Sequence, residues 1–323
     1  MLRRMLLVTL TAATLSTQAT GADQRATTAS VWQPPAGATQ SRLWPGAAPD
    51  MPKGPKPDEV LFEVKKVPGF FYRGISNVTD PTITVFKPAR GNTGAAIVVF
   101  PGGGFRLLAI DLEGTEICDW VTSRGMTCVL LYRVPKSNHY WNPDQRRHVA
   151  PAAPFALQDA QRAIRLVRAN ASQWGVDPSK IGVLGMSAGG YLVAQTSNVS
   201  EPTYKPVDAA DSLSSLPDFA IALYPGHLCR SGASLDPSIK VSKTTPPTFL
   251  HAAWDDPVNN ICNTTVYAHA LASAGSPAEV HVFAHGKHAF GLRHRDLPVA
   301  FWPSLVEKWL SAINMLPTPP ADG

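Results

Sequence analysis

A serine flanked by two glycines constrains the fold of this chain more than any other feature of its sequence. Residues 185–189 read Gly-Met-Ser-Ala-Gly, and they join the apolar run 181–184 to a helix-like pattern. Gly-x-Ser-x-Gly between a strand and a helix is typical of a nucleophile elbow, which holds the serine on a sharp, strained turn. The strand and the helix approach closely there, so the flanking positions must lack a side chain. We therefore predict that Ser187 is a nucleophile at the end of a buried strand.

The base and the acid that such a nucleophile requires follow two later strand patterns. An apolar run leads into Asp255 and Asp256, and an alternating run leads into a loop with His285 and His288. An imidazole would take the proton of the serine, and a carboxylate would fix the tautomer of the imidazole. We favour His288 because an aromatic–glycine pair behind it would pack its loop down, with His285 as the alternative. We favour Asp255 because it is the first residue able to turn back toward the imidazole, with Asp256 as the alternative.

A glycine triplet supplies a further part of the predicted site. The β-branched run 96–100 is followed by Pro-Gly-Gly-Gly-Phe, with the glycines at 102–104. Backbone N–H groups there can turn toward a developing oxyanion, and one such donor lowers the barrier by about 3–4 kcal/mol. A glycine triplet alone would indicate only a flexible turn. Together with the serine turn, it predicts an oxyanion hole formed by the N–H groups of Gly103, Gly104 and Ala188.

The N-terminus differs in composition from the rest of the chain. Two arginines precede a short apolar stretch and then small residues, a pattern typical of a secretory signal peptide, which we assign to residues 1–22. An uncleaved membrane anchor is the alternative. Residues 23–56 are rich in Ala, Thr, Pro and Gly and are expected to form an extended arm, ordered where Trp44 packs. Alternating strand and helix patterns indicate one catalytic α/β domain over 57–323.

Charge and residue spacing limit the partners that this chain is expected to have. The formal charge of +5 falls to +3 without the two arginines of the signal peptide, so nucleic acid is not expected as a partner. Beyond that peptide no apolar stretch is long enough to span a bilayer, so no membrane partner is expected either. No Cys-x-x-Cys spacing occurs, and we expect neither a metal nor a cofactor. Asp111 and Glu113 are expected to be acids at a helix N-terminus.

Four cysteines in an exported chain permit disulfides. Cys118 lies in a helix pattern and Cys128 begins a strand, and buried free thiols suit both positions. Cys229 and Cys262 lie in two loops that are expected to leave the same edge of neighbouring strands. We therefore predict a disulfide between Cys229 and Cys262.

Several segments resemble a known family: LWPG, DPTITVFKP, VVFPGGGF, EGTEICDW, LQDAQRAIRLVR, WGVDPSKIGVLGMSAGG, PPTFLHAAWDDPVN and HVFAHGKHAFGL. They are similar to exported bacterial α/β-hydrolases of the acetyl-xylan-esterase-like, or propeller-less prolyl-oligopeptidase-like, group, and the resemblance runs from about residue 43 to 309. It implies an α/β-hydrolase fold, with a mostly parallel central sheet flanked by helices on both faces. It also implies a Ser187–Asp255–His288 triad. The sequence departs from the family pattern in the loop KHAFG, where a glycine commonly precedes the aromatic residue, and at 258–259, Val-Asn in place of the common Val-Pro.

The resemblance and the motifs together predict a secreted or periplasmic serine esterase that forms an acyl-enzyme and deacetylates small-molecule or oligosaccharide esters, such as those of xylan. Phe105 and Met186 would crowd a long acyl chain. Tyr140 and Trp141 could stack on a sugar ring, although Trp141 could equally pin its loop to the body of the protein. A serine peptidase of the prolyl-oligopeptidase type and a non-catalytic sugar-binding relative are the alternatives.

Overall fold

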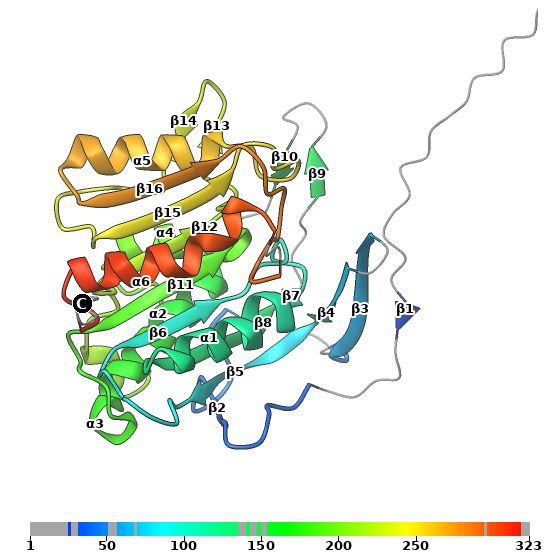
Figure 1. Ribbon diagram of the computed structural model, residues 1–323. Coiled ribbons are helices and arrows are strands. Elements are labelled where there is room, and N and C mark those ends of the chain that lie inside the picture. The colour runs from blue at the N-terminus through cyan, green and yellow to red at the C-terminus, as the bar shows by residue number, and fades with distance from the viewer. Residues whose placement is uncertain are drawn as a thin grey trace, which may run out of the picture.

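A computed structural model describes residues 25–26, 32–50, 57–67, 70–134, 140–142, 147–149, 154–293 and 296–317. The expected signal peptide lies outside these residues. One eight-stranded sheet forms the centre of the molecule (Figure 1). In spatial order its strands are β16 (Ala278–Phe283), β15 (Thr248–Ala253), β12 (Phe219–Leu223), β11 (Ile181–Met186), β6 (Ala96–Phe100), β8 (Thr127–Val134), β5 (Val78–Phe86) and β2 (Thr39–Arg42).

The sheet is mostly parallel, as predicted. The pairs from β16 to β8 are parallel, and only the pairs β8–β5 and β5–β2 are antiparallel. Every residue of β6, β11, β12 and β15 is buried. A parallel strand covered on both faces needs apolar residues at successive positions, which explains why these four segments are apolar in the sequence except at Thr248 and His251 of β15.

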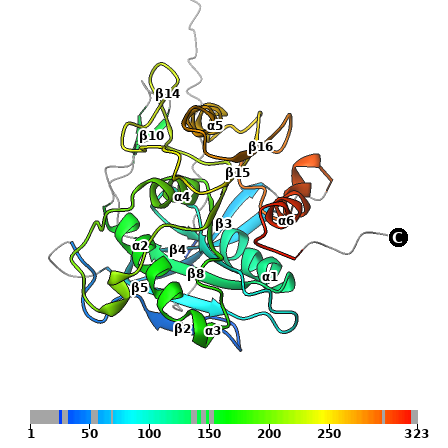
Figure 2. The same ribbon diagram turned by 90° about the vertical axis from the view of Figure 1, so that its left-hand side faces the viewer.

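Helices cover both faces of the sheet (Figure 2). On one face α1 (Glu116–Ser123) and α6 (Trp302–Ala312) bury apolar side chains in one core cluster. On the other face α2 (Pro154–Ala169), α4 (Ala188–Asn198) and α5 (Cys262–Ala274) bury theirs in a second cluster. The shorter helices are the π-helix η1 (Asp111–Thr115), α3 (Ala171–Trp174), and the 3-10 helices η2 (Ala209–Ser212) and η3 (Pro298–Phe301). The three layers confirm the fold class that the sequence predicted.

The N-terminal segment contributes to the sheet more than an arm would. Trp44 is buried and its Nε1–H donates to Asp159 at 2.6 Å, as expected of an anchor. However, Thr39–Arg42 forms the edge strand β2, paired with β5. This strand lies on the N-terminal side of the boundary expected at residue 57. It was not visible in the sequence because Thr-Gln-Ser-Arg contains no apolar residue.

Three small sheets complete the described structure. The first has the order β1 (Arg25–Ala26), β3 (Val60–Val67), β4 (Phe70–Ser76), β7 (Leu108–Ala109), and β7 directly follows the glycine triplet. The others are the hairpins β9 (Tyr140–Asn142) with β10 (Arg147–Val149), and β13 (Cys229–Arg230) with β14 (Ser234–Leu235). Within the described ranges, no helix is long and apolar enough to cross a membrane and no cluster of side chains could hold a metal ion.

The four cysteines form two disulfides. Cys229 is bonded to Cys262, as predicted, with 5.7 Å between their Cα atoms. Cys118 and Cys128 are also bonded, so the expectation of free thiols there is wrong. Helix α1 and strand β8 are joined by a short turn at Gly125, where φ is +75°, so the helix folds directly back onto the strand. This brings the two Cα atoms within 5.3 Å, inside the usual range for a disulfide.

Candidate active site

Ser187 lies on a strained turn between β11 and α4. Its backbone has φ +55° and ψ −117°, a combination that a residue with a side chain rarely adopts. A Cβ atom at Gly185 would lie 2.2 Å from the carbonyl oxygen of Gly189, and one at Gly189 would lie 1.9 Å from that of Phe100. Neither approach leaves room for a methyl group. The segment thus has the geometry of a nucleophile elbow, for the steric reason that the sequence suggested.

A chain of hydrogen bonds links the serine to a histidine and an aspartate. The Oγ atom of Ser187 lies 3.1 Å from Nε2 of His288, and Nδ1 of His288 lies 2.7 Å from Oδ2 of Asp256. The Asp256 side chain is 1% exposed and that of His288 is 11% exposed. The structure therefore brings together Ser187 and His288, two of the predicted residues, but it places Asp256 on the imidazole and not Asp255.

Asp255 supports the histidine loop instead, so its assignment to the triad is wrong. Its Oδ1 atom accepts the backbone N–H groups of Gly286 (2.9 Å) and Lys287 (2.8 Å), and its Oδ2 atom lies 3.3 Å from Nδ1 of His285. Partial burial raises the pKa of Asp255, but these hydrogen bonds outweigh it and hold the pKa below its usual value. The ring of His285 is 76% exposed and belongs to this outer contact. The backbone turn after β15 points the side chain of Asp255 outward and that of Asp256 inward, toward His288.

Asp256 is fixed by the backbone of its own turn. Its Oδ1 atom accepts the N–H groups of Val258 (2.8 Å) and Asn259 (2.9 Å), which leaves Oδ2 for the imidazole. Hydrogen bonds to a carboxylate from a rigid turn hold both its position and its orientation. The acid of the site is therefore oriented before any substrate arrives.

The glycine triplet lies beside Ser187, as predicted. Gly103 has φ +129° and Gly104 has φ +64°, and a Cβ atom at Gly103 would lie 2.1 Å from the carbonyl oxygen of Leu107. None of the hydrogen bonds in the described part of the chain is donated by the N–H group of Gly103, Gly104 or Ala188. These three groups have the availability that an oxyanion hole requires. Their catalytic role remains a prediction.

Glu113 is a site residue whose position the sequence analysis missed. It lies in the first turn of η1, as expected of a helix acid, but it is buried. Its Oε2 atom accepts the N–H of Gly102 at 2.8 Å, and its Oε1 atom accepts the hydroxyl of Tyr224 at 2.9 Å. The ring of Tyr224 in turn lies edge-on to His288, with 5.1 Å between centroids. Burial, and then the nearby carboxylate of Glu113, raise the pKa of Tyr224 well above its usual value, so this hydroxyl stays a donor. Residues 110–117 read Ile-Asp-Leu-Glu-Gly-Thr-Glu-Ile, so the sequence did not indicate which of these acids is buried.

Ser187 and His288 line a cleft of about 240 Å³. It is lined by Tyr72, Gly103, Gly104, Arg106, Leu107, Ala109, Glu113, Ser187, His227, Val258, Asn259, His288 and Ala289. A smaller pocket of about 30 Å³ shares Leu107 with the cleft and is lined mainly by apolar side chains, Phe105 among them. Phe105 does not line the cleft itself, but its ring lies 5.7 Å from that of His227, which does. Its contact with an acyl chain stays a prediction.

Three other residues were expected to contact the substrate, namely Met186, Tyr140 and Trp141. Met186 is 0% exposed and belongs to the core cluster beneath α1 and α6, so the prediction that it would crowd a substrate is wrong. Successive strand residues point to opposite faces of a sheet, which explains why the neighbour of Ser187 points into the core. Tyr140 and Trp141 lie in β9, whose backbone pairs with β10, but their side chains lie outside the described part of the structure.

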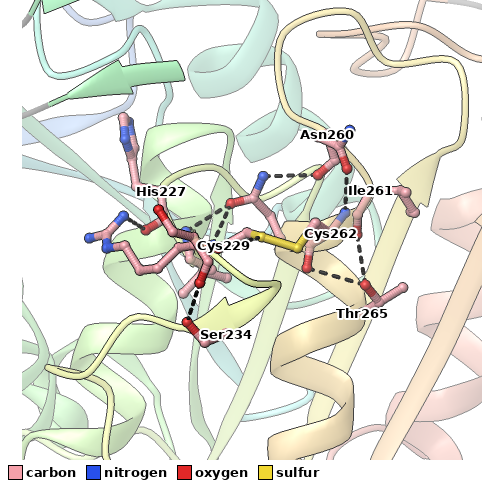
Figure 3. The surroundings of a disulfide bond; sticks show 11 residues. His227, Cys229, Ser234, Asn260, Ile261, Cys262 and Thr265 are labelled. Atoms are coloured by element: carbon pink, nitrogen blue, oxygen red, sulfur yellow. Dashed lines mark hydrogen bonds between the residues drawn. A yellow bond between two sulfur atoms is a disulfide. The ribbon is translucent and has the colours of Figure 1, made fainter. Parts of the chain in front are cut away.

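The Cys229–Cys262 disulfide joins the first residue of β13 to the first residue of α5 (Figure 3). The loop between β12 and β13 carries His227, and another loop leads from Asp256 into α5. Asn263 reinforces the junction, because its Oδ1 atom accepts the N–H groups of Leu228 (2.8 Å) and Cys229 (3.0 Å). The disulfide thus links the loop of Asp256 covalently to the loop of His227.

Comparison with known proteins agrees with this geometry. The BD-FAE family model matches residues 133–211. An acetylxylan esterase of Xylanibacter ruminicola is 27% identical over 225 residues, which is 62% of this chain and 42% of that protein. Endo-1,4-beta-xylanase B of Butyrivibrio fibrisolvens is 27% identical over 217 residues, 59% of this chain and 32% of that protein. The chain thus spans less than half the length of these two curated relatives.

A solved structure matches over much more of its length. The acetyl ester-xyloside bifunctional hydrolase of Caldicellulosiruptor lactoaceticus is 30% identical, with a TM-score of 0.63, and the match covers 86% of this chain and 97% of that one. The sheet order, the elbow and the three-layer architecture define an α/β-hydrolase. Within this class, the chain belongs to the esterases of the acetyl-xylan-esterase-like group.

Proposed function

We propose that this protein is a serine carboxylic-ester hydrolase that works through an acyl-enzyme. The observation that carries the proposal is the hydrogen-bonded chain from Ser187 through His288 to Asp256, at the mouth of a cleft. The membership of an esterase family supports it. The strained backbone of Ser187 supports it further, because strain of this kind concentrates at functional sites.

The proposed mechanism has two halves. Oγ of Ser187 attacks the ester carbonyl carbon while Nε2 of His288 accepts the proton, and the N–H groups of Gly103, Gly104 and Ala188 stabilise the oxyanion. The C–O bond to the alcohol then breaks, and His288 gives the proton to that oxygen. In the second half a water molecule attacks the acyl group, His288 takes its proton, and the acid leaves as the proton returns to Oγ. Asp256 holds the imidazole in the tautomer with its proton on Nδ1.

The proposed substrates are short-chain esters of carbohydrates, acetyl esters of xylan or xylo-oligosaccharides above all. The names of two relatives, acetylxylan esterase and acetyl ester-xyloside hydrolase, support this substrate class. The apolar pocket that shares Leu107 with the cleft has a volume of about 30 Å³, too small for a long acyl chain, and the cleft is lined partly by polar groups such as Arg106, His227 and Asn259. A small apolar recess beside a polar cleft suits an acetyl group on a polar alcohol.

We further propose that the protein is exported to the periplasm or the medium. The basic and then apolar pattern of residues 1–22 supports export, and so do two disulfides in a chain of ordinary domain size.

The test compares the purified protein with its Ser187→Ala variant on three substrate classes. p-Nitrophenyl acetate and acetylated xylo-oligosaccharides should be hydrolysed, with acetate cleaved faster than octanoate, and a dipeptidyl anilide should not be. Ser187→Ala should lower turnover by several orders of magnitude. Equal turnover of wild type and Ser187→Ala would contradict the mechanism, and faster cleavage of octanoate or of the anilide would contradict the substrate class.

A further inference from the structure

Asn259 touches both ends of the catalytic chain. Its backbone N–H donates to Oδ1 of Asp256 at 2.9 Å, and its side-chain Nδ2 lies 3.4 Å from Oγ of Ser187. The same Nδ2 atom donates to the carbonyl oxygen of Tyr224 at 2.9 Å. With the bonds through His288, these contacts form a closed ring of hydrogen bonds around the nucleophile.

The orientation of the amide follows from its partners. The carbonyl oxygen of Tyr224 can only accept a hydrogen bond, so the side-chain atom next to it must be the NH2 group. That group has two hydrogens, one for Tyr224 and one directed at Ser187. The amide also packs against the backbone at Gly226, where a Cβ atom would lie 2.8 Å from Oδ1 of Asn259. The amide therefore lies against the backbone of Gly226, in the space that the missing side chain leaves.

We propose that the side-chain amide of Asn259 is a positioning group for Oγ of Ser187. The hydroxyl hydrogen of Ser187 points to His288, and an N–H from Asn259 on one lone pair leaves the other lone pair directed at the substrate. A distance of 3.4 Å is long for a hydrogen bond, and catalytic contacts of this kind shorten when substrate is bound. The proposal rests on the proposed function, since it assumes that Ser187 is the nucleophile.

The test uses Asn259→Ala and Asn259→Asp, with Asn260→Ala as the matched control. Asn260 lies in the same loop, is exposed, and its side chain accepts the N–H of Cys262 without contacting Ser187 (Figure 3). The readouts are the rate at which an organophosphate ester labels Ser187, and kcat and KM for p-nitrophenyl acetate. Both Asn259 variants should be labelled about tenfold more slowly, with a matching fall in kcat and little change in KM, because one neutral hydrogen bond is lost. Asn260→Ala should behave as wild type.

Asn259→Asp adds a measurement that a purely structural role would not move. A carboxylate at this position places a negative charge beside Ser187 and His288, and it stabilises the protonated imidazole. Asp256, which contacts the ring of His288, and Tyr224, which packs against it, are unchanged in this variant. So are the other ionisable side chains that line the same cleft, namely Tyr72, Arg106, Glu113 and His227. The acid limb of its kcat/KM profile should therefore move up by about one pH unit.

The outcomes separate this proposal from the proposed function. Wild-type protein that is not labelled at Ser187 overturns both. Labelling of wild type together with unchanged labelling and an unchanged pH profile in both Asn259 variants overturns only the role of Asn259. Asn259→Ala that fails to fold leaves the isosteric Asn259→Asp to decide, by the same two readouts.

Discussion

Exchanging one carboxyl oxygen for an amide at Asp256 should abolish most activity, whereas the same change at Asp255 should not. In wild type Oδ1 of Asp256 accepts two backbone N–H groups, from Val258 and Asn259, and Oδ2 faces Nδ1 of His288. In Asp256→Asn the remaining oxygen must stay with the two N–H groups, because an NH2 group cannot accept them. The NH2 group then faces Nδ1 of His288 and donates to it.

This arrangement traps the wrong tautomer of the imidazole. Because Nδ1 now accepts a hydrogen bond, the single ring proton of neutral His288 lies on Nε2. Nε2 is 3.1 Å from Oγ of Ser187, and once protonated it cannot take the hydroxyl proton of Ser187. The loss known for such a trap in a serine enzyme is about 10⁴-fold in kcat, equivalent to about 5.5 kcal/mol of barrier.

Asp255→Asn serves as the control, one residue away. The oxygen of asparagine can still accept from Gly286 and Lys287, and the NH2 group faces only the exposed ring of His285. We expect kcat within about threefold of wild type, since no bond to His288 changes. The assay is kcat and KM on p-nitrophenyl acetate, with thermal unfolding to show that both variants fold. A folded Asp256→Asn protein with more than a tenth of wild-type turnover, or a 10³-fold loss in Asp255→Asn, would refute the assignment.

Two further predictions concern stability. Burial, and to a lesser degree the charge of His281, lower the pKa of His251 to about 3, so the unfolded chain binds a proton below about pH 6.5 that the folded chain excludes. The free energy of unfolding should therefore fall by about 1.4 kcal/mol for each pH unit by which the pH is lowered below about 6.5. Between pH 7 and pH 5, urea unfolding should show that wild type loses about 2 kcal/mol more than His251→Leu. Equal losses in the two proteins would contradict this role of His251. Replacing Cys229 and Cys262 together by alanine should lower the free energy of unfolding by about 4 kcal/mol. Replacing Cys118 and Cys128, which close a shorter loop, should lower it by about 3 kcal/mol. The reverse order in denaturant titrations would contradict the loop-entropy reasoning.

The features that depend on local chemistry could be predicted from the sequence. The strands of the parallel sheet could be predicted because burial on both faces demands continuous apolar runs, as in β6 and β11. The turn at Ser187 could be predicted because it requires glycine at positions 185 and 189. The disulfide at Cys229 followed from the rule that parallel strands end at the same edge of a sheet, without any knowledge of the loops themselves.

The features that depend on how a loop turns could not be predicted. Asp255 and Asp256 are adjacent and identical in type, and only the backbone after β15 decides which of them faces His288. The bond between Cys118 and Cys128 depends on how tightly α1 folds back onto β8. Asn259 was visible in the sequence only as a departure from the family's common Val-Pro, and its contact with Ser187 exists only because three separate loops meet.

The crowding at the elbow also determines where this enzyme can change in the course of evolution. A methyl group at position 185 or 189 would overlap a backbone oxygen, so these two positions must stay glycine. The cleft walls at Val258, His227 and Arg106 lie on loops, which in general vary more than the strands and helices that they connect. New alcohol specificities should therefore arise by substitution in these loops while the serine turn stays unchanged, and a mutant library confined to them would explore substrates without endangering the nucleophile.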